Sequence, residues 1–572
     1  MAAASAVVAS ALAPSAAAAD DPANQPPFGG EQVPPLVERG GDSPPPGFEL
    51  GASEAQGIAS ETAEVRDLYE ADGEPDSDFQ RLGLTVATRG DETWEVRVRR
   101  SGEREVRAIV VVDDATGQVA DVFTGSAIET KLARGYEGAV GGKASSWWIW
   151  LPLCALFVAP FFDPRRPLRL LHLDLLALLG LSVSLFFFDR GEIEWSVLWV
   201  YPVLAYLFVR MLVVGFHGVF GRAAAGAGAR RAEFLVPVAR RSWLLGAVIA
   251  LACFHVGYQS LEGKVIDVGV ASAIGADRLT SGEDVYGEDF GEELPERGDV
   301  RGDVYGPVNY LAYSPFELAL PWEDEWDDVP AAQAAAVAFT LLTALALFAL
   351  GRRLRNGEEG GTLGVALAFA WLAYPFTLYT AASSFNDSLV ALLVACSLLA
   401  VASPPARGAL AALAGLTKFG PLALAPLLAA GTGDRRPRTL VLFAAAFAVT
   451  AAIVTFPAIP DGGLREIYDR SLGYQASRGS PFSIWGQAPA LEPLQTASKV
   501  FAVGLAVLVF FVPRRRTLPQ LAALAAAVLV AVQLTSSHWL YPYAVWFLPL
   551  VLAAVFAAYR PTRSLDTDTD QP

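Results

Sequence analysis

Long apolar runs recur along this chain from about residue 146 to its end. A helix needs roughly 20 apolar residues to cross about 30 Å of hydrocarbon, and several runs approach that length. A bilayer offers no hydrogen-bond partner to an exposed backbone, so each long run is predicted to be a spanning helix. Hydrophobic residues make up 53% of the 572 residues. We therefore expect a mostly α-helical, multi-pass membrane protein.

Charged residues are divided between alternate loops. The net charge is −17, and the acids collect near the N-terminus and between Asp267 and Asp328. The arginines collect in short loops, which the positive-inside rule places in the cytoplasm. This pattern predicts a cell-membrane protein with an extracytoplasmic N-terminal part and a cytoplasmic tail at residues 561–572. It gives no support to nucleic-acid binding, which uses basic patches interleaved with aromatic residues. The arginine loops contain, among others, Arg165, Arg222, Arg352, Arg435 and Arg514.

The chain begins with two segments of unusual composition. Residues 1–19 are alanine-rich and end in small residues before Asp20, as a cleaved signal peptide does. They lack the positive start of such a peptide, so a plain tail is the alternative. Residues 20–52 are rich in proline and glycine and are predicted to be a flexible linker.

Residues 53–141 are predicted to form a small α+β extracytoplasmic domain. Apolar and polar side chains alternate in Trp94–Val98, and a valine-rich strand at Ile109–Val112 leads into the turn Asp113–Gly117. This order of strands and acidic turn resembles the PepSY family of extracytoplasmic modules. An unrelated strand-rich domain is the alternative.

The run Gly408–Ala430 breaks the alternation of loops. A single span here would carry Arg435 to the outside, against the positive-inside rule. A hairpin removes the conflict, and Lys418-Phe419-Gly420-Pro421 supplies its break, because proline lacks a backbone donor and glycine loosens the helix. We therefore expect two short arms with Lys418 at their tip.

Asp267 is the first candidate for chemistry. It follows the apolar run Trp243–Tyr258 and opens an acidic segment that returns to the membrane near Ala331. An apolar helix does not hold an unpaired carboxylate, so a carboxylate at its water-facing end suits acid–base chemistry on a membrane-borne substrate. An ordinary surface acid is the alternative.

Three cations are candidates for binding a phosphate. Lys418 marks a polar pocket or a bound anion, unless its side chain snorkels to an interface. Arg478 suits a bidentate phosphate contact or simply solvates its loop. His538 is the best placed of the four histidines, with a bland interfacial histidine as the alternative.

Further substrate contacts are expected in the external loops. The tyrosines there could stack on sugar rings or form an ordinary aromatic belt. Asn386 and Asp387 open a helix, either as substrate contacts or as its cap. Trp485 and Trp539, in the runs that contain Arg478 and His538, are also candidate substrate contacts. The tyrosines are Tyr286, Tyr305 and Tyr310.

Together these residues carry a family resemblance. An external aspartate is followed by Gly-x-x-x-Tyr, Tyr-x-Pro, Asn-Asp, Thr-Lys-x-x-Pro, Arg-Gly-x-Pro-x-Ser-x-Trp and a terminal His-Trp-x-Tyr. This order resembles the GT-C glycosyltransferases that use polyprenyl-phosphate sugars, especially the bacterial mannosyltransferases of family 87. The resemblance assigns residues 242–560 to a GT-C-like core and leaves residues 146–241 as additional transmembrane helices.

The resemblance implies an inverting transfer of a sugar, with mannose expected, from polyprenyl phosphate to an extracytoplasmic lipid or glycan acceptor. Asp267 would take the proton of the acceptor hydroxyl. Lys418, Arg478 and His538 would hold the departing lipid phosphate. No nucleotide, other cofactor or metal ion is expected, and the chain shows no glycine-rich phosphate loop. Asp267 is followed by Val268–Ala271 instead of the aromatic residues expected for the family, which bears on the substrate.

Two other functions compete with this hypothesis. A transporter or flippase of a lipid-linked substrate predicts charged residues along a whole path through the membrane, whereas the candidates here gather on the external side. A sensory or scaffold protein would use its membrane part only as an anchor. That function leaves the two long external loops and Lys418 without a purpose.

Overall fold

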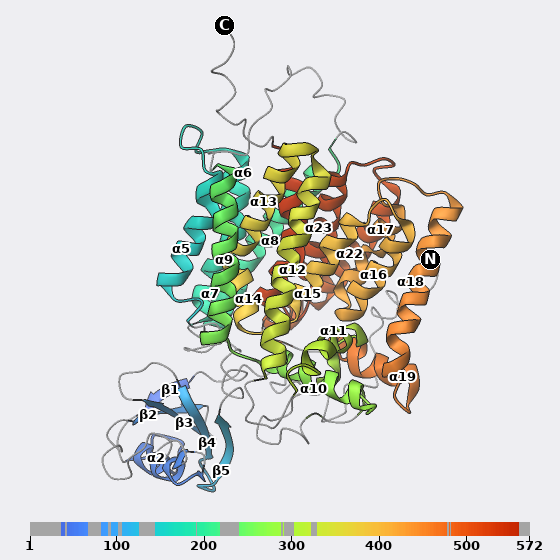
Figure 1. The fold of residues 1–572 in the computed structure, drawn as a ribbon. Coiled ribbons are helices and arrows are strands. Elements are labelled where there is room, and N and C mark those ends of the chain that lie inside the picture. The colour runs from blue at the N-terminus through green and yellow to red at the C-terminus, as the bar shows by residue number, and fades with distance from the viewer. Residues whose placement is uncertain are drawn as a thin grey trace.

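The computed structural model describes most of the chain and contains a small β-sheet domain and a large helical body. In Figure 1 the sheet lies near the end of the body that carries α10 (Asp267–Ser281) and α11 (Pro307–Glu317). The candidate signal peptide at residues 1–19, the tail at residues 561–572 and Arg478 lie outside the described residues. The described residues are 36–39, 43–63, 65–66, 82–89, 93–100, 106–124, 143–189, 192–217, 240–287, 290, 302–321, 329–477, 480 and 482–559.

The sheet is an antiparallel meander of five strands in sequence order. Alternate side chains of β3 point to one face, where Trp94, Val96 and Val98 are fully buried in the core shared with α2. The small α+β fold is thus confirmed. The strand β1 lies in the segment predicted to be a flexible linker. The sequence does not predict this strand, because its four residues between Pro-Pro and Gly-Gly are too few to show alternation. The elements are β1 (Leu36–Arg39), α2 (Ala52–Ser60), β2 (Leu82–Arg89), β3 (Thr93–Arg100), β4 (Val106–Asp113) and β5 (Val119–Thr124).

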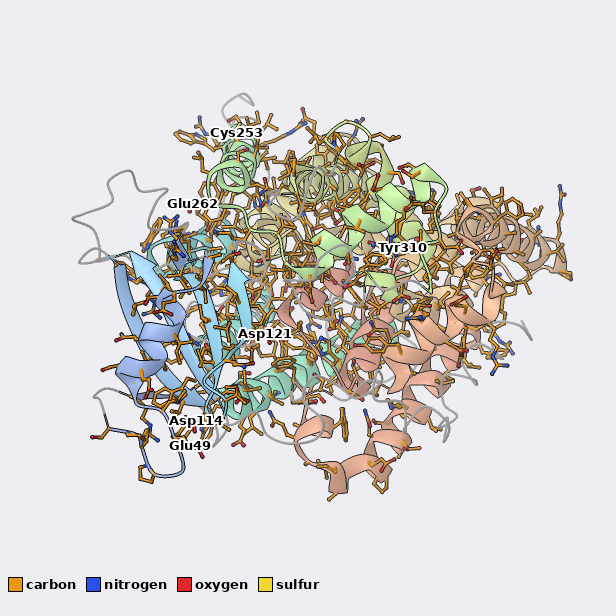
Figure 2. All side chains as sticks on the ribbon, turned by 90° about the horizontal axis from the view of Figure 1, so that it is seen from below. Glu49, Asp114, Asp121, Cys253, Glu262 and Tyr310 are labelled. Carbon is orange, nitrogen blue, oxygen red and sulfur yellow. The ribbon has the colours of Figure 1, made fainter. Side chains whose placement is uncertain are left out.

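Asp114 holds this domain together at one corner, where it lies beside Glu49 (Figure 2). Its carboxylate accepts the N–H groups of Glu49 and Leu50 at 2.6 and 3.0 Å and the indole Nε1 of Trp94 at 2.7 Å. Asp114 is only 4% exposed. A buried acceptor shared by three donors therefore joins the segment before α2 to the sheet.

Replacing Asp114 with alanine should lower the free energy of local unfolding by roughly 2–4 kcal/mol, because buried donors lose their acceptor. Hydrogen-exchange mass spectrometry of the full-length protein should show faster exchange in β3 and β4. Asp121→Ala, on the exposed face of β5, is the control and should change little. Equal exchange in the two variants would mean that Asp114 does not stabilise the domain.

The helical body is built from spans with apolar outer surfaces. The described residues contain seven helices long and apolar enough to cross a membrane, or eight with the bent pair α13–α14. On α18, Val441, Val449 and Ile453 are more than half exposed, a surface that is stable against lipid but not against water. The protein is therefore a multi-pass membrane protein. The spans are α6 (Leu170–Leu179) with α7 (Leu181–Phe188), α8 (Ile193–Gly215), α9 (Arg241–Glu262), α12 (Pro330–Leu354), α13 (Gly357–Ala373) with α14 (Pro375–Ala382), α18 (Pro437–Thr455), α22 (Glu492–Phe511) and α23 (Leu518–Thr535).

Shorter helices complete the helical body. The helix axis bends by 58° between α13 and α14, next to Pro375. Proline at the first position of a helix removes a hydrogen bond that would continue the preceding one, so the bend follows from the sequence. The shorter helices are α5 (Trp147–Val158), α15 (Asp387–Leu399), α16 (Pro404–Thr417), α17 (Ala425–Ala430) and α24 (Ala544–Phe556).

The predicted hairpin is confirmed. The helix α16 ends at Thr417, Lys418 has an extended backbone, and a short 3₁₀ turn leads into α17. The arms pack closely, since a Cβ on Gly415 would lie 2.2 Å from the side chain of Leu422. After α17, Thr432 O accepts the N–H of Arg516 at 3.1 Å. The two arginine-rich turns thus meet at one end of the body, and Lys418 lies at the other.

Candidate functional site

Several helices begin or end at the same end of the helical body. Asp267 is the first residue of α10, Asp387 is the first residue of α15, and Lys418 directly follows α16. Gly306, which precedes α11, donates its N–H to Thr417 O at 3.2 Å. A Cβ at this glycine would clash with the backbone of α16, so the close approach of α11 requires glycine.

Lys418 and Asp387 form a buried ion pair. The distance from Nζ to Oδ1 is 2.9 Å, and the side chains are 10% and 0% exposed. The indole Nε1 of Trp546 donates to the same Oδ1 at 2.6 Å. The amino end of α15 adds favourable backbone dipoles around the carboxylate. The structure thus places Asp387, a candidate substrate contact or cap, as the counter-ion of Lys418.

Three aromatic rings surround the ammonium group of Lys418. Their centroids lie 5.5 Å (Tyr305), 5.3 Å (Tyr543) and 5.7 Å (Trp546) from Nζ. Each ring at such a distance attracts a cation by about 0.5–2 kcal/mol. Tyr305 and Tyr543 are partly exposed, whereas Trp546 is buried. A cation beside aromatic rings suits a ligand that joins a phosphate to a sugar.

Asp267 lies near this ion pair and is half-buried. Its Oδ1 accepts the N–H of Val268 at 2.8 Å, and its negative charge acts on Lys418. Two carboxylates therefore influence one lysine. Asp387 is fully enclosed, whereas the side chain of Asp267 is only partly buried.

A chain of buried hydrogen bonds connects the two aspartate-bearing segments. The Oγ of Ser272 donates to Val268 O at 2.6 Å and accepts from Asn309 Nδ2 at 2.9 Å. Asn309 Oδ1 in turn accepts from Asn386 Nδ2 at 2.7 Å, and all three polar side chains are fully buried. Val268 follows Asp267, and Asn386 precedes Asp387. The chain therefore fixes the start of α10 relative to the start of α15, and Asn386 serves this interior network.

His538 is connected to Lys418 through Tyr543. The two ring centroids lie 6.4 Å apart, and the Tyr543 ring in turn covers Lys418. The Nδ1 of His538 lies 2.8 Å from Ser480 Oγ, which orients the imidazole. The structure thus brings Asp267, Lys418 and His538 to one end of the body. Arg478, which lies outside the described residues, precedes Ser480 by two positions.

Tyr286 and Tyr310 are buried beside the loop segment that carries Tyr305. They are 1% and 0% exposed, and their hydroxyls donate to Tyr305 O at 2.8 Å and Gly302 O at 2.7 Å. Figure 2 shows Tyr310 on the segment of α11. Their rings are therefore unavailable for stacking on a sugar, and they shape the loop that presents Tyr305.

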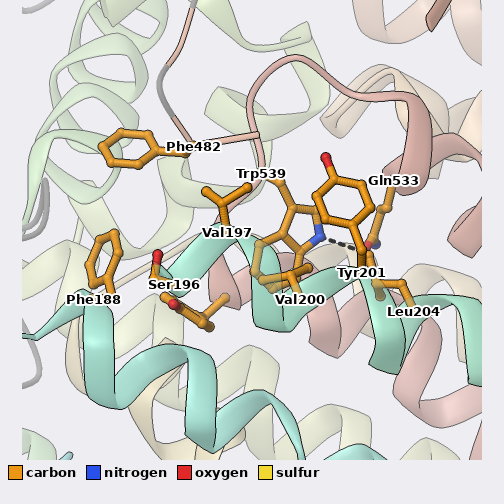
Figure 3. A pocket seen from close by; sticks show the side chains of 10 residues that line it. Phe188, Ser196, Val197, Val200, Tyr201, Leu204, Phe482, Gln533 and Trp539 are labelled. Atoms are coloured by element: carbon orange, nitrogen blue, oxygen red, sulfur yellow. Dashed lines mark hydrogen bonds between the residues drawn. The ribbon is translucent and has the colours of Figure 1, made fainter. Parts of the chain in front are cut away.

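The two candidate tryptophans are held by hydrogen bonds to the last turns of α23. Trp485 Nε1 donates to Leu534 O at 2.9 Å. Trp539 Nε1 donates to Gln533 Oε1 at 3.1 Å, while Gln533 Nε2 donates to Tyr543 O at 2.8 Å. Figure 3 shows Gln533 and Trp539 lining a narrow groove with residues of α8. Gln533 thus links Trp539 to the backbone of Tyr543, whose ring covers Lys418.

The additional N-terminal helices support these loops. On α7, Ser184 Oγ lies 2.7 Å from the hydroxyl of Tyr541. On α8, the hydroxyl of Tyr201 accepts the N–H of Ile484 at 3.1 Å. These contacts connect residues almost three hundred positions or more apart in sequence. The helices at residues 146–241 are therefore part of the frame of the site.

Sequence reasoning missed Tyr543, Trp546 and Asn309. Trp546 lies in the apolar run of α24 and carried no signal beyond that of a core residue. Asn309 is a polar residue in an aromatic run, a signal that could have singled it out. Within the described ranges, no three His, Cys, Asp or Glu side chains gather as ligands for a metal ion.

The family comparison gives the class of protein that this fold and site define. The chain is a membrane glycosyltransferase, an assignment that favours an enzyme over a transporter or a scaffold. Residues 304–537 match the model of glycosyltransferase family 87, which confirms the resemblance predicted from the residues. The match includes Tyr305, Asp387 and Lys418, whereas Asp267 and His538 lie outside it. No curated protein and no solved structure matches the chain. The PepSY resemblance stays a prediction.

Proposed function

We propose that the protein transfers mannose from polyprenyl phosphate to a lipid or glycan acceptor on the extracytoplasmic face, with inversion at the sugar carbon. The observation that carries the proposal is the half-buried Asp267 beside the Lys418–Asp387 pair. An apolar helical body suits a lipid-borne donor. The arginine-rich turns lie at the opposite end, which supports an extracytoplasmic site through the positive-inside rule.

Asp267 acts as the general base. It removes the proton of the acceptor hydroxyl as that oxygen attacks the anomeric carbon of the donor sugar. The bond from this carbon to the phosphate oxygen breaks, and the lipid phosphate leaves with the electron pair. Attack from the face opposite the leaving group inverts the configuration. A positioned base contributes about 10²–10⁴-fold to such a reaction.

The leaving phosphate requires more positive charge than Lys418 alone supplies. Lys418 is already balanced by Asp387, so the pair adds little net charge. The amino ends of α10 and α15 contribute backbone dipoles equivalent to roughly half a charge each. His538 and Arg478 are proposed to supply the remainder as the phosphate departs. The negative charge of the leaving phosphate is therefore stabilised by several cations together and not by Lys418 alone.

The donor is tested in membranes with and without the full-length protein. Labelled mannose should enter a lipid or glycan product when supplied as polyprenyl-phosphate mannose, and mass spectrometry should identify the product. Membranes lacking the protein, and the same assay with another polyprenyl-phosphate sugar, are the controls. Transfer from a nucleotide sugar without a lipid intermediate would contradict the proposed donor. A product with the donor's own anomeric configuration would contradict inversion.

A further inference from the structure

Two arginine-rich turns pack together at the end of the body opposite the candidate site. One joins α17 to α18 and the other joins α22 to α23, and they are linked by the bond from Arg516 N to Thr432 O. They approach so closely that a Cβ on Gly433 would lie 2.3 Å from Arg514 O. We call Arg407, Arg435, Arg514 and Arg516, which surround this contact, the arginine cluster.

Two members of the arginine cluster are used by the fold. Arg516 donates to Val509 O at 2.7 Å, and Arg435 donates to Phe511 O at 3.0 Å, so both guanidinium groups cap the carboxyl end of α22. A helix end offers the equivalent of roughly half a negative charge. Two full positive charges therefore remain incompletely balanced. Burial, and then the charge of Arg435, lower the pKa of Arg516 to about 10, which leaves it charged at neutral pH.

Arg407 has no such use. It lies in the first turn of α16, is 3% exposed, and makes no side-chain hydrogen bond or ion pair within the described part of the chain. Its guanidinium fits against Gly431, where a Cβ would lie 1.5 Å from Nη1 and where φ is +52°. Asp434 attracts it, but that carboxylate is exposed and already accepts from Arg436 N and Thr439 Oγ1.

An enclosed guanidinium without an acceptor is costly. Loss of hydration without a paired anion costs several kcal/mol per ion, so such a group is stable when an anion completes the site. Guanidinium groups match the geometry of phosphate oxygens, with two parallel hydrogen bonds from one planar fork. Positive pockets between membrane helices, at the level of the headgroups, are suited to anionic lipids. The cluster has this position, because it joins the ends of spanning helices.

We propose that the arginine cluster binds the phosphate of an anionic phospholipid in the leaflet opposite the candidate site, with Arg407 as the central contact. Arg435 and Arg516 hold the turn in place through α22 and add to the local positive potential. The bound lipid stabilises the junction of the hairpin with α22 and α23. This site is separate from sugar transfer and does not depend on the proposed donor.

The test uses the full-length protein, delipidated in neutral detergent and placed in nanodiscs of phosphatidylcholine with or without phosphatidylglycerol. Phosphatidylglycerol should raise the Tm by roughly 3 °C or more, and native mass spectrometry should show it retained. Arg407→Gln should lose most of this shift, while Arg407→Lys should keep part of it, because charge remains without the planar fork. Arg353→Gln, an exposed arginine at the end of α12, is the matched control and should keep the full shift.

Several outcomes would overturn the proposal. Equal Tm values in the two lipids would mean that anionic lipid does not bind, as expected if acids of the chain itself neutralise Arg407. Equal losses in Arg407→Gln and Arg353→Gln would reduce the effect to general surface charge. The same shift from inorganic phosphate in phosphatidylcholine nanodiscs would show a free-phosphate site. If Arg407→Gln does not fold, Arg407→Lys and the lipid retained by the unaltered protein decide the question.

Discussion

Asp267→Asn should lower sugar transfer at least about 100-fold while leaving the protein folded. An amide does not accept the proton of an alcohol, and the loss of a general base costs about 10²–10⁴ in rate. The fold should tolerate the change, because an asparagine oxygen can still accept the N–H of Val268 at the start of α10. Initial rates with saturating polyprenyl-phosphate mannose measure the loss, and unfolding curves of the purified protein check stability.

The matched control is Asp277→Asn, since Asp277 is a partly exposed aspartate on the same helix. This variant should transfer sugar at a rate close to that of the unaltered protein. Binding of the lipid donor should persist in Asp267→Asn, because the base acts on the acceptor. Full activity of Asp267→Asn would remove this residue from the role of base. Loss of donor binding would point instead to a role in holding the substrate.

The spans and the hairpin could be predicted because their signals are local. Membrane helices follow from the length of apolar runs alone. The hairpin follows from Lys418-Phe419-Gly420-Pro421 and from the arginines on either side, which constrain where the loops lie. The structure confirms the break at this place and also shows that the two arginine-rich turns are in contact.

The pairing of side chains could not be predicted, because packing between helices decides it. Lys418 and Asp387 are 31 positions apart, and Trp546 lies 159 positions from Asp387. The sequence alone does not distinguish whether Asp387 is a helix cap or a substrate contact. Likewise Tyr286 and Tyr310 lie in stretches whose composition is typical of a surface loop, but the fold directs both side chains inward.

The ion pair of Lys418 and Asp387 provides a test that separates folding from chemistry. Lys418→Met should lower the free energy of unfolding by roughly 3–5 kcal/mol, because it leaves a buried carboxylate without its counter-ion. The matched control is Lys143→Met. It breaks the Lys143–Glu262 pair, whose side chains are 51% and 37% exposed, and should cost about 1 kcal/mol or less.

The double variant Lys418→Met/Asp387→Asn should regain much of the lost stability, since neither charge remains and the asparagine oxygen can still accept from Trp546. It should nevertheless fail to transfer sugar, because the Lys418 ammonium proposed to donate a hydrogen bond to the leaving phosphate is gone. Unfolding curves and initial rates of the two single variants and the double variant complete the cycle. Recovery of both stability and transfer would make Lys418 a structural partner of Asp387 only, and the phosphate would then depend on His538, Arg478 and the helix ends. Recovery of stability without transfer separates the two roles, because a purely structural lysine has no effect on the rate once its counter-ion is neutralised.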